Sequence, residues 1–212
     1  MERILWLYGL PYNQDYPVVC FDERPCFLIE NETVPIPMKQ GKVMKENFKY
    51  KKNGSCALLA AIEPLTAKRI AGIYDTRKKK DYAHFMKNLA AQYPEAKKIR
   101  LVQDNLNTHC ESAFYQNFPA DEAFDLANRF EFYQTPKSGS WLNMIEIEFA
   151  ALAKQCLHDR IPNKELLEQK VLALVKERQS KGIKINWQFS INDAREKLNW
   201  KYLKVNEANV KY

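Results

Sequence analysis

Acidic residues stand at two places in the sequence where carboxylates could act together. Asp22 directly follows the apolar run at residues 17–21, and Asp104 closely follows a second apolar run at residues 99–102. Both runs are typical of buried strands, and catalytic groups in α/β sheets gather at the carboxyl ends of strands. A carboxylate beside a buried strand is costly unless it is hydrogen-bonded, paired or bound to a cation. Each aspartate alone could be a turn or helix-capping residue, but the two together with a third acid on a later helix favour a shared cation site.

A third acid is available on a helix predicted over residues 141–157. The apolar stripe that would face the core consists of Trp141, Ile145, Phe149, Leu152 and Cys156. Glu148 lies about 60° to one side of the centre of this stripe and Glu146 about 100° to the other, at about 100° per residue. Helical geometry alone therefore leaves both glutamates as candidates.

Three carboxylates without a cluster of histidine or cysteine favour a hard cation, Mg²⁺ or Mn²⁺, over zinc. Two such ions would suit in-line displacement at a phosphodiester, since one can activate the attacking oxygen and the other can stabilise the leaving oxygen. The sequence contains no glycine-rich Walker loop, so a reaction driven by ATP is not expected.

Two further features could assist such a site. His109 follows Asp104 by five residues and is either a packing or helix-start histidine or a group that contacts a metal ligand or a phosphate. Residues 38–52 are expected to form a solvated loop or hairpin that carries the lysines Lys39, Lys42, Lys45, Lys49, Lys51 and Lys52. These lysines either are simply solvated or neutralise a nucleic-acid backbone, with Phe48 or Tyr50 available to stack on bases.

The composition places these residues in one basic domain. The chain has 212 residues, 46% of them hydrophobic, which is enough for a packed core. Its net charge of +7 favours a polyanionic partner, nucleic acid before anionic membrane. No apolar run of about 18 residues and no signal peptide is present, and the five cysteines form no CxxC pair. We therefore expect a cytoplasmic protein with reduced, buried thiols and no membrane span.

The order of predicted elements indicates a mixed α/β fold. Strands are expected at residues 17–21, 56–62, 69–74, 99–102 and 130–133. Helices are expected at residues 81–93, 108–118, 120–129, 141–157 and 163–180, with a last short helix that starts near residue 190 and ends near 198.

Six sequence blocks, taken together, resemble the catalytic domain of transposases from bacterial insertion sequences. The blocks are VVCFDE (18–23), YKKNGS (50–55), QDNLNTH (103–109), TPKSGSWLNMIEIEF (135–149), QCLHDRIP (155–162) and INWQFSINDAREKL (185–198). These transposases form the bacterial branch of the mariner superfamily, the DDE endonucleases with an RNase H-like fold. The resemblance runs in order from about residue 2 to about residue 203.

The resemblance implies an RNase H-like mixed sheet flanked by helices, with a basic loop or hairpin inserted after the first strand. Asp22 and Asp104 match the two metal-binding aspartates, and Glu146 matches the third acid, so Glu148 becomes a neighbour. These three acids would hold two Mg²⁺ or Mn²⁺ ions, with Asn105 and His109 in contact with the ligands. One departure is Ser138, where relatives often have a histidine.

The implied domain covers residues 17–203, with its C-terminal helices from about residue 163. Residues 1–16 would form a lead-in segment and residues 204–212 a tail. The N-terminal helix-turn-helix region that relatives use to recognise their terminal repeats is expected to be absent.

The implied activity is metal-dependent cleavage of DNA at element ends, followed by transfer of the freed strand into target DNA. The expected partners are these two DNAs and further copies of the chain, in a homodimer or higher oligomer associated with the nucleoid. An alternative is a decayed or repurposed remnant that binds DNA without cutting it, and a ribonuclease H or junction resolvase is a less favoured enzyme.

Overall fold

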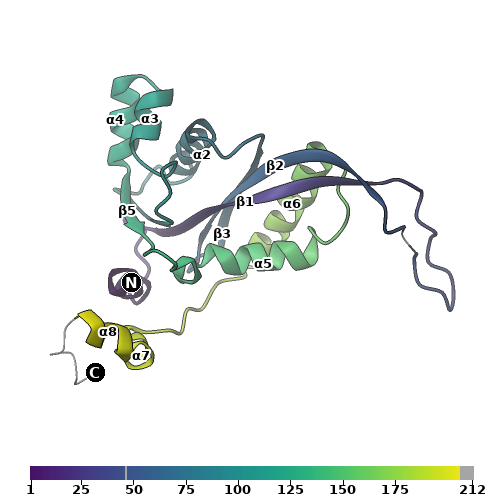
Figure 1. The fold of residues 1–212 in the computed structure, drawn as a ribbon. Coiled ribbons are helices and arrows are strands. Elements are labelled where there is room, and N and C mark those ends of the chain that lie inside the picture. Colours follow the sequence, from purple (N-terminus) through teal and green to yellow (C-terminus); the bar gives the residue numbers. More distant parts are fainter. Residues whose placement is uncertain (46, 206–212) are drawn as a thin grey trace.

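A mixed five-stranded sheet forms the centre of the molecule, described here from a computed structural model that covers residues 1–45 and 47–205. Its strands are β1 (Val18–Asn31), β2 (Tyr50–Glu63), β3 (Lys68–Tyr74), β4 (Ile99–Gln103) and β5 (Phe130–Gln134), in the order β3-β2-β1-β4-β5 (Figure 1). The pairs β1–β2 and β2–β3 are antiparallel, whereas β1–β4 and β4–β5 are parallel. The predicted mixed α/β class is confirmed.

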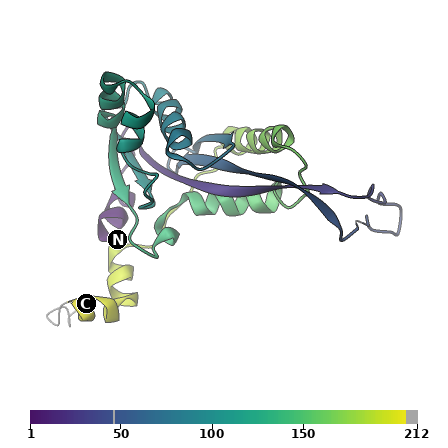
Figure 2. The same cartoon turned by 45° about the horizontal axis from the view of Figure 1, so that its top comes forward.

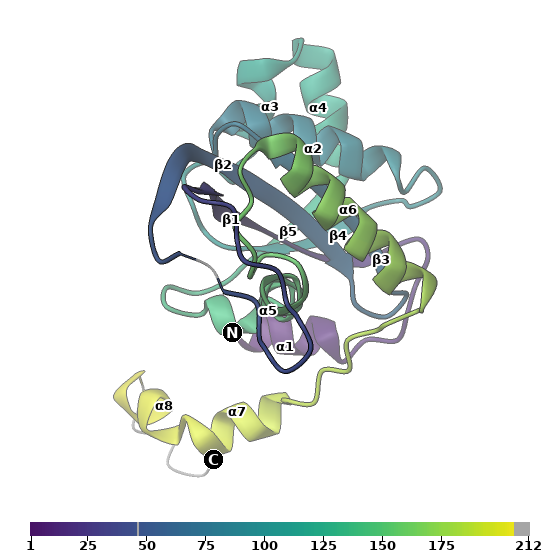
Figure 3. The same cartoon turned by 90° about the vertical axis from the view of Figure 1, so that its right-hand side faces the viewer.

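Helices cover both faces of the sheet. They are α1 (Glu2–Tyr8), α2 (Lys79–Ala91), α3 (Ser112–Asn117), α4 (Ala120–Asn128), α5 (Ile145–Gln155), α6 (Lys164–Ser180), α7 (Ile191–Lys197) and α8 (Asn199–Val205). The helices α2, α3 and α4 pack on one face, and α1, α5 and α6 supply the core on the other (Figure 3). None of the helices in the described ranges is long and apolar enough to cross a membrane. The cysteines are free thiols as expected, all buried except the half-buried Cys110.

Strand β1 supplies side chains to both cores because successive residues of a strand point to opposite faces. Val19 and Phe21 are completely buried on the α2 face, whereas Cys20 is completely buried on the α5 face. The same alternation directs Asp22 toward α5 and Glu23 toward α2.

Strands β1 and β2 extend past the sheet as a long two-stranded arm, which projects away from the helices (Figure 2). The predicted first strand was too short, because Pro25 and the charged residues around it interrupt the apolar pattern although Cys26 still packs in the core. Arg160 fastens the far end of the two strands, where the tip of the arm begins, by donating hydrogen bonds to Asn31 Oδ1 at 2.7 Å and to the Lys49 carbonyl at 3.0 Å. The expected basic hairpin insertion is therefore the tip of this arm.

The predicted helix over residues 141–157 is divided. A 3₁₀ turn, Ser140–Leu142, is followed by Asn143 in an extended conformation, and α5 begins only at Ile145. This break changes the helical phase, so Trp141 does not belong to the core stripe; it is 47% exposed and packs edge-on against Phe189. The other four members of the stripe are buried as predicted.

One further prediction needed correction, and two short helices were not predicted. The helix expected over residues 108–118 is shorter, Ser112–Asn117, because residues 104–111 form the loop that places His109. The short helices α1 and α8 were not predicted. The first of them lies in the expected lead-in segment, and Arg195 of α7 pairs with its Glu2 at 2.8 Å.

Candidate active site

Asp22 and Asp104 lie just beyond the point where the parallel pairing of β1 with β4 ends, Asp22 within β1 and Asp104 directly after β4. The register of β1 and β4 pairs Cys20 with Val102, so two residues further along Asp22 comes level with Asp104. Asp104 directly follows the last residue of β4, where the chain leaves the sheet. The structure thus brings together the first two acids of the predicted site.

The Asp22 carboxyl is in an environment that disfavours its negative charge. It is 8% exposed, and its one hydrogen bond within the described residues comes from the Glu23 N–H, at 2.8 Å. Burial is the main cause that raises the pKa of Asp22 to about 7; the nearby Asp104 and Glu23 carboxylates raise it as well, whereas the backbone hydrogen bond and His109 act in the opposite direction. A bound cation would relieve both the burial and the repulsion, so this group fits a metal ligand.

His109 lies between two carboxylates and is 2% exposed. Its Nδ1 is in close contact with Asp104 Oδ1, and its Nε2 is 2.5 Å from Glu23 Oε2. These contacts are ion pairs without aligned hydrogen bonds, since Asp104 Oδ1 and Glu23 Oε2 have no hydrogen-bond partner among the described residues. Burial alone would lower the pKa of His109, but the two carboxylates outweigh it and raise the pKa to about 9. The imidazole is therefore positively charged and balances the acids around it.

Aromatic rings and one amide fix the position of His109. The Tyr82 ring stacks on the imidazole at 5.0 Å, and the Phe21 ring meets it edge-on at 5.3 Å. The completely buried Gln103 donates to the His109 carbonyl at 2.9 Å and accepts from the Tyr82 hydroxyl at 2.8 Å. Gln103 therefore holds the loop after β4. This role of Gln103 was not predicted from the sequence, although a polar side chain at the end of an apolar strand could have indicated it.

Glu146 lies on the first turn of α5, exposed to solvent. The start of α5 is attached to β1 because the buried Asn143 donates from Nδ2 to the Phe21 carbonyl at 2.8 Å. The Glu146 N–H in turn donates to the Asn143 carbonyl at 3.1 Å. In the described part of the chain, however, no three histidine, cysteine, aspartate or glutamate side chains are grouped so that they could hold a metal ion. Glu146 is thus on the element next to Asp22, but its carboxylate does not join the aspartates.

Glu148 has a different environment. It is 2% exposed and accepts paired hydrogen bonds from Arg69 of β3, at 3.0 and 3.1 Å, and from Arg178 of α6, at 2.9 and 3.1 Å. Burial would raise the pKa of Glu148, but the two guanidinium groups lower it below its ordinary value. Both carboxylate oxygens are occupied, so Glu148 joins three elements and is not available as a metal ligand.

Comparison with known protein families assigns the chain to a family. A family described as DDE superfamily endonuclease matches residues 17–168, which include all three predicted acids. The chain belongs to the DDE superfamily endonucleases. A comparison with curated proteins finds no match.

Solved structures of Mos1 transposase share the fold of this DDE endonuclease. A Mos1 paired-end complex with the left transposon end matches with a TM-score of 0.57 and 15% identity, over 100% of this chain and 60% of the Mos1 chain. A Mos1 mariner paired-end complex with Mn matches with a TM-score of 0.54 at 15% identity, and a pre-cleavage Mos1 transpososome with 0.54 at 14%, each over the same shares of the two chains. The chain therefore spans about 60% of the length of these relatives and has their RNase H-like fold.

The lysines predicted to bind DNA lie far from the aspartates of this DDE endonuclease. All six are exposed; Lys39, Lys42, Lys45 and Lys49 lie in the tip of the arm, and Lys51 and Lys52 lie on β2. The register pairs Lys52 with Ile29, seven residues beyond Asp22, or about 23 Å at 3.3 Å per residue. These lysines therefore do not stand beside the aspartates, because the arm is longer than predicted.

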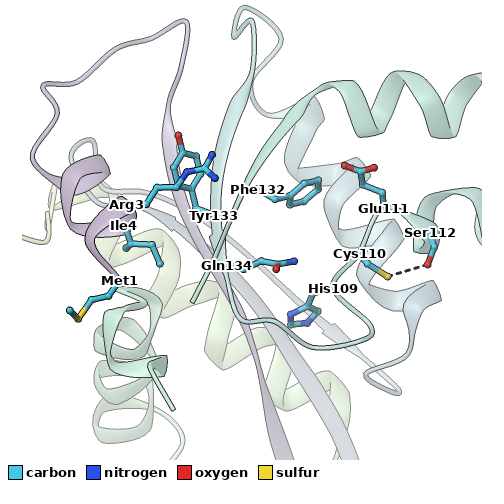
Figure 4. A pocket seen from close by; sticks show the side chains of 10 residues that line it. All are labelled: Met1, Arg3, Ile4, His109, Cys110, Glu111, Ser112, Phe132, Tyr133 and Gln134. Atoms are coloured by element: carbon cyan, nitrogen blue, oxygen red, sulfur yellow. Dashed lines mark hydrogen bonds between the residues drawn. The ribbon is translucent and has the colours of Figure 1, made fainter. Parts of the chain in front are cut away.

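Asn105 and the space beside His109 complete the description of the site. Asn105 is exposed and makes no side-chain hydrogen bond with any described residue, so the structure does not place it against the acids. A hollow of about 650 Å³ opens beside His109 between α1, the end of β5 and the loop at residues 109–112 (Figure 4). Arg3 lies over the Tyr133 ring at 4.5 Å on one side of this hollow, and Gln134 points into it.

Proposed function

We propose that this chain is the catalytic domain of a DDE transposase of the insertion-sequence type, which cuts DNA at element ends and joins it to target DNA. The observation that carries the proposal is that Asp22 and Asp104 lie level with each other where the parallel pairing of β1 with β4 ends, in a DDE endonuclease. The similar Mos1 structures are named as complexes with a transposon end and as a strand transfer complex, which supports DNA as the substrate.

The proposed cofactor is Mg²⁺ or Mn²⁺, as two ions held by Asp22, Asp104 and Glu146. Mos1 complexes with Mn and with Mg support this choice, as does the raised pKa of the Asp22 carboxyl. When bound, such ions activate the attacking oxygen and stabilise the leaving oxygen at the phosphodiester. For Glu146 to act as the third ligand, its exposed side chain must turn toward the aspartates.

In this proposal the chain's own side chains orient the ligands. His109 holds Asp104 through Nδ1, and Glu23 holds the other nitrogen of the same imidazole. Asn143 keeps the start of α5 attached to β1, which limits how far Glu146 can move away. Asn105 has the proposed role of contacting the ligands when metal and DNA are present.

The arm would contact DNA at a distance from the reacting phosphate. At about 3.4 Å per base pair, the ~23 Å between Asp22 and Lys52 corresponds to about seven base pairs. We propose that the arm lysines contact the backbone there, and that two or more copies of the chain act together on paired ends inside the cell.

The test is nicking of supercoiled plasmid DNA by the 212-residue chain with Mn²⁺ or Mg²⁺. The expected result is metal-dependent nicking that Asp104→Asn abolishes and Lys176→Gln, an exposed change on α6, leaves intact. Equal nicking by the chain and by Asp104→Asn would refute the assignment. A chain that binds DNA but shows no nicking dependent on Asp104 would instead be a non-catalytic remnant.

A further inference from the structure

A second basic surface lies outside the arm, at the start of α2. Residues 77–80 are four consecutive cations, of which Arg77, Lys78 and Lys80 are exposed and Lys79 is half-buried. None of the four forms an ion pair with any carboxylate in the described ranges. Their positive charge is therefore available to a partner.

The two aspartates that flank this run have other partners. Asp75 pairs with Lys164 at 2.6 Å, and Asp81 accepts from the Thr76 hydroxyl and from the Lys78 N–H to cap α2. The run thus keeps its charge even though its sequence neighbours are acidic.

The basic run lies close to the candidate active site. Tyr82, which stacks on His109, is three residues after Lys79 and so lies on the same side of α2, about one helical turn away. Lys79 itself donates from Nζ to the Ser112 hydroxyl at 3.1 Å, which joins α2 to the first turn of α3, directly after the loop that carries His109. The run is therefore fixed beside the loop that follows Asp104.

The basic run also follows a strand that ends close to the level of Asp22 in the sheet. Strand β3 runs parallel to β1, and the registers place its last residue, Tyr74, level with Pro25, only three residues beyond Asp22. Helix α2 packs on the face opposite α5, so the run and the predicted third acid border the site from different sides (Figure 3).

We propose that residues 77–80 bind the phosphate backbone of the DNA duplex that enters the active site. The inference rests on the proposed function only in taking DNA as the substrate. A row of cations without carboxylate partners beside the site matches the charge of a duplex, whose phosphates are bound without reading the bases. This surface differs from the arm because it lies beside the acids and not about 23 Å away.

The test measures binding of the full chain to a 30-base-pair duplex by fluorescence anisotropy in EDTA, at several salt concentrations. The variant combines Arg77→Gln, Lys78→Gln and Lys80→Gln, and leaves Lys79 in place. If each exposed cation contacts one phosphate, the slope of log K against log salt should decrease in magnitude by about 2 to 3, and affinity at low salt should fall about tenfold or more.

A matched control removes the same charge at exposed positions away from the site. It combines Lys98→Gln, Lys176→Gln and Lys184→Gln. A slope change in the first variant equal to that in the control would overturn the proposal. Should the first variant have a lowered melting temperature, Arg77→Gln with Lys80→Gln, which preserves the residue before α2, is expected to decrease the slope by about 2.

The outcome separates this inference from the proposed function. A smaller salt slope in a chain that shows no nicking dependent on Asp104 would support the basic surface and refute the catalytic assignment. Nicking dependent on Asp104 with an unchanged salt slope would support the catalytic assignment and refute the basic surface.

Discussion

The protonation of His109 gives the metal-free protein a measurable pH dependence of stability. Burial by itself would lower the pKa of this imidazole, but the Asp104 and Glu23 carboxylates raise it from 6.5 to about 9. Between these two values the native state binds a proton that the unfolded chain does not, so the free energy of unfolding falls as the pH rises. Each pH unit contributes about 1.4 kcal/mol, so the expected loss is about 3 kcal/mol. The contribution is complete below pH 6.5 and is lost above pH 9.

Urea unfolding in EDTA at intervals from pH 6 to pH 10 measures this loss. For a chain of this size, about 3 kcal/mol corresponds to a fall in melting temperature of roughly 6–12 °C. The variant His109→Gln should show a much flatter profile from pH 6.5 to 9, whereas His158→Gln, at an exposed histidine, should retain the profile of the unsubstituted protein. A His109→Gln protein that loses the same stability over this window would refute the reasoning.

Three further outcomes are expected. Glu148→Gln removes the shared partner of two buried guanidinium groups and should cost about 3–5 kcal/mol in urea unfolding, whereas Glu146→Gln should change stability by less than about 0.5 kcal/mol and abolish nicking. Asn143→Leu leaves the Phe21 carbonyl unpaired in the interior and should lower the free energy of unfolding by about 1–3 kcal/mol. In Asn143→Gln, the melting temperature should return toward the original only if the longer amide still reaches that carbonyl. Mn²⁺ at 100 times its dissociation constant should raise the free energy of unfolding by about 2.7 kcal/mol at pH 8, and Asp22→Asn should remove this gain.

The nearness of Asp22 and Asp104 was predictable, because both acids close apolar runs and catalytic groups gather at the carboxyl ends of strands in α/β sheets. The partner of Glu23 was not. Alternation along β1 directs Glu23 to the α2 face, but only the fold of the loop after β4 shows that Glu23 contacts His109 on that face. A contact that depends on how a loop turns leaves no periodic signal in the sequence.

The choice between Glu146 and Glu148 shows a related limit. A wheel drawn over residues 141–157 assumes one continuous helix, and the extended Asn143 breaks it. More decisively, the angles on a wheel do not reveal that two arginines from β3 and α6 converge on Glu148. The lengths of β1 and β2 were underestimated for a simpler reason, since a two-stranded arm outside the core needs no apolar alternation.

The site depends on both layers of the fold through one short segment of β1. The Phe21 ring packs against His109 on the α2 face, while its carbonyl accepts the hydrogen bond from Asn143 that attaches α5. The next two residues then point to opposite faces, Asp22 to α5 and Glu23 to His109. A shift of this segment by one residue would exchange the two carboxylates between the faces and separate each from its partners. The antiparallel pairing with β2 and the parallel pairing with β4 fix the register on both sides, so the central position of β1 is what allows two helical layers to meet at one pair of acids.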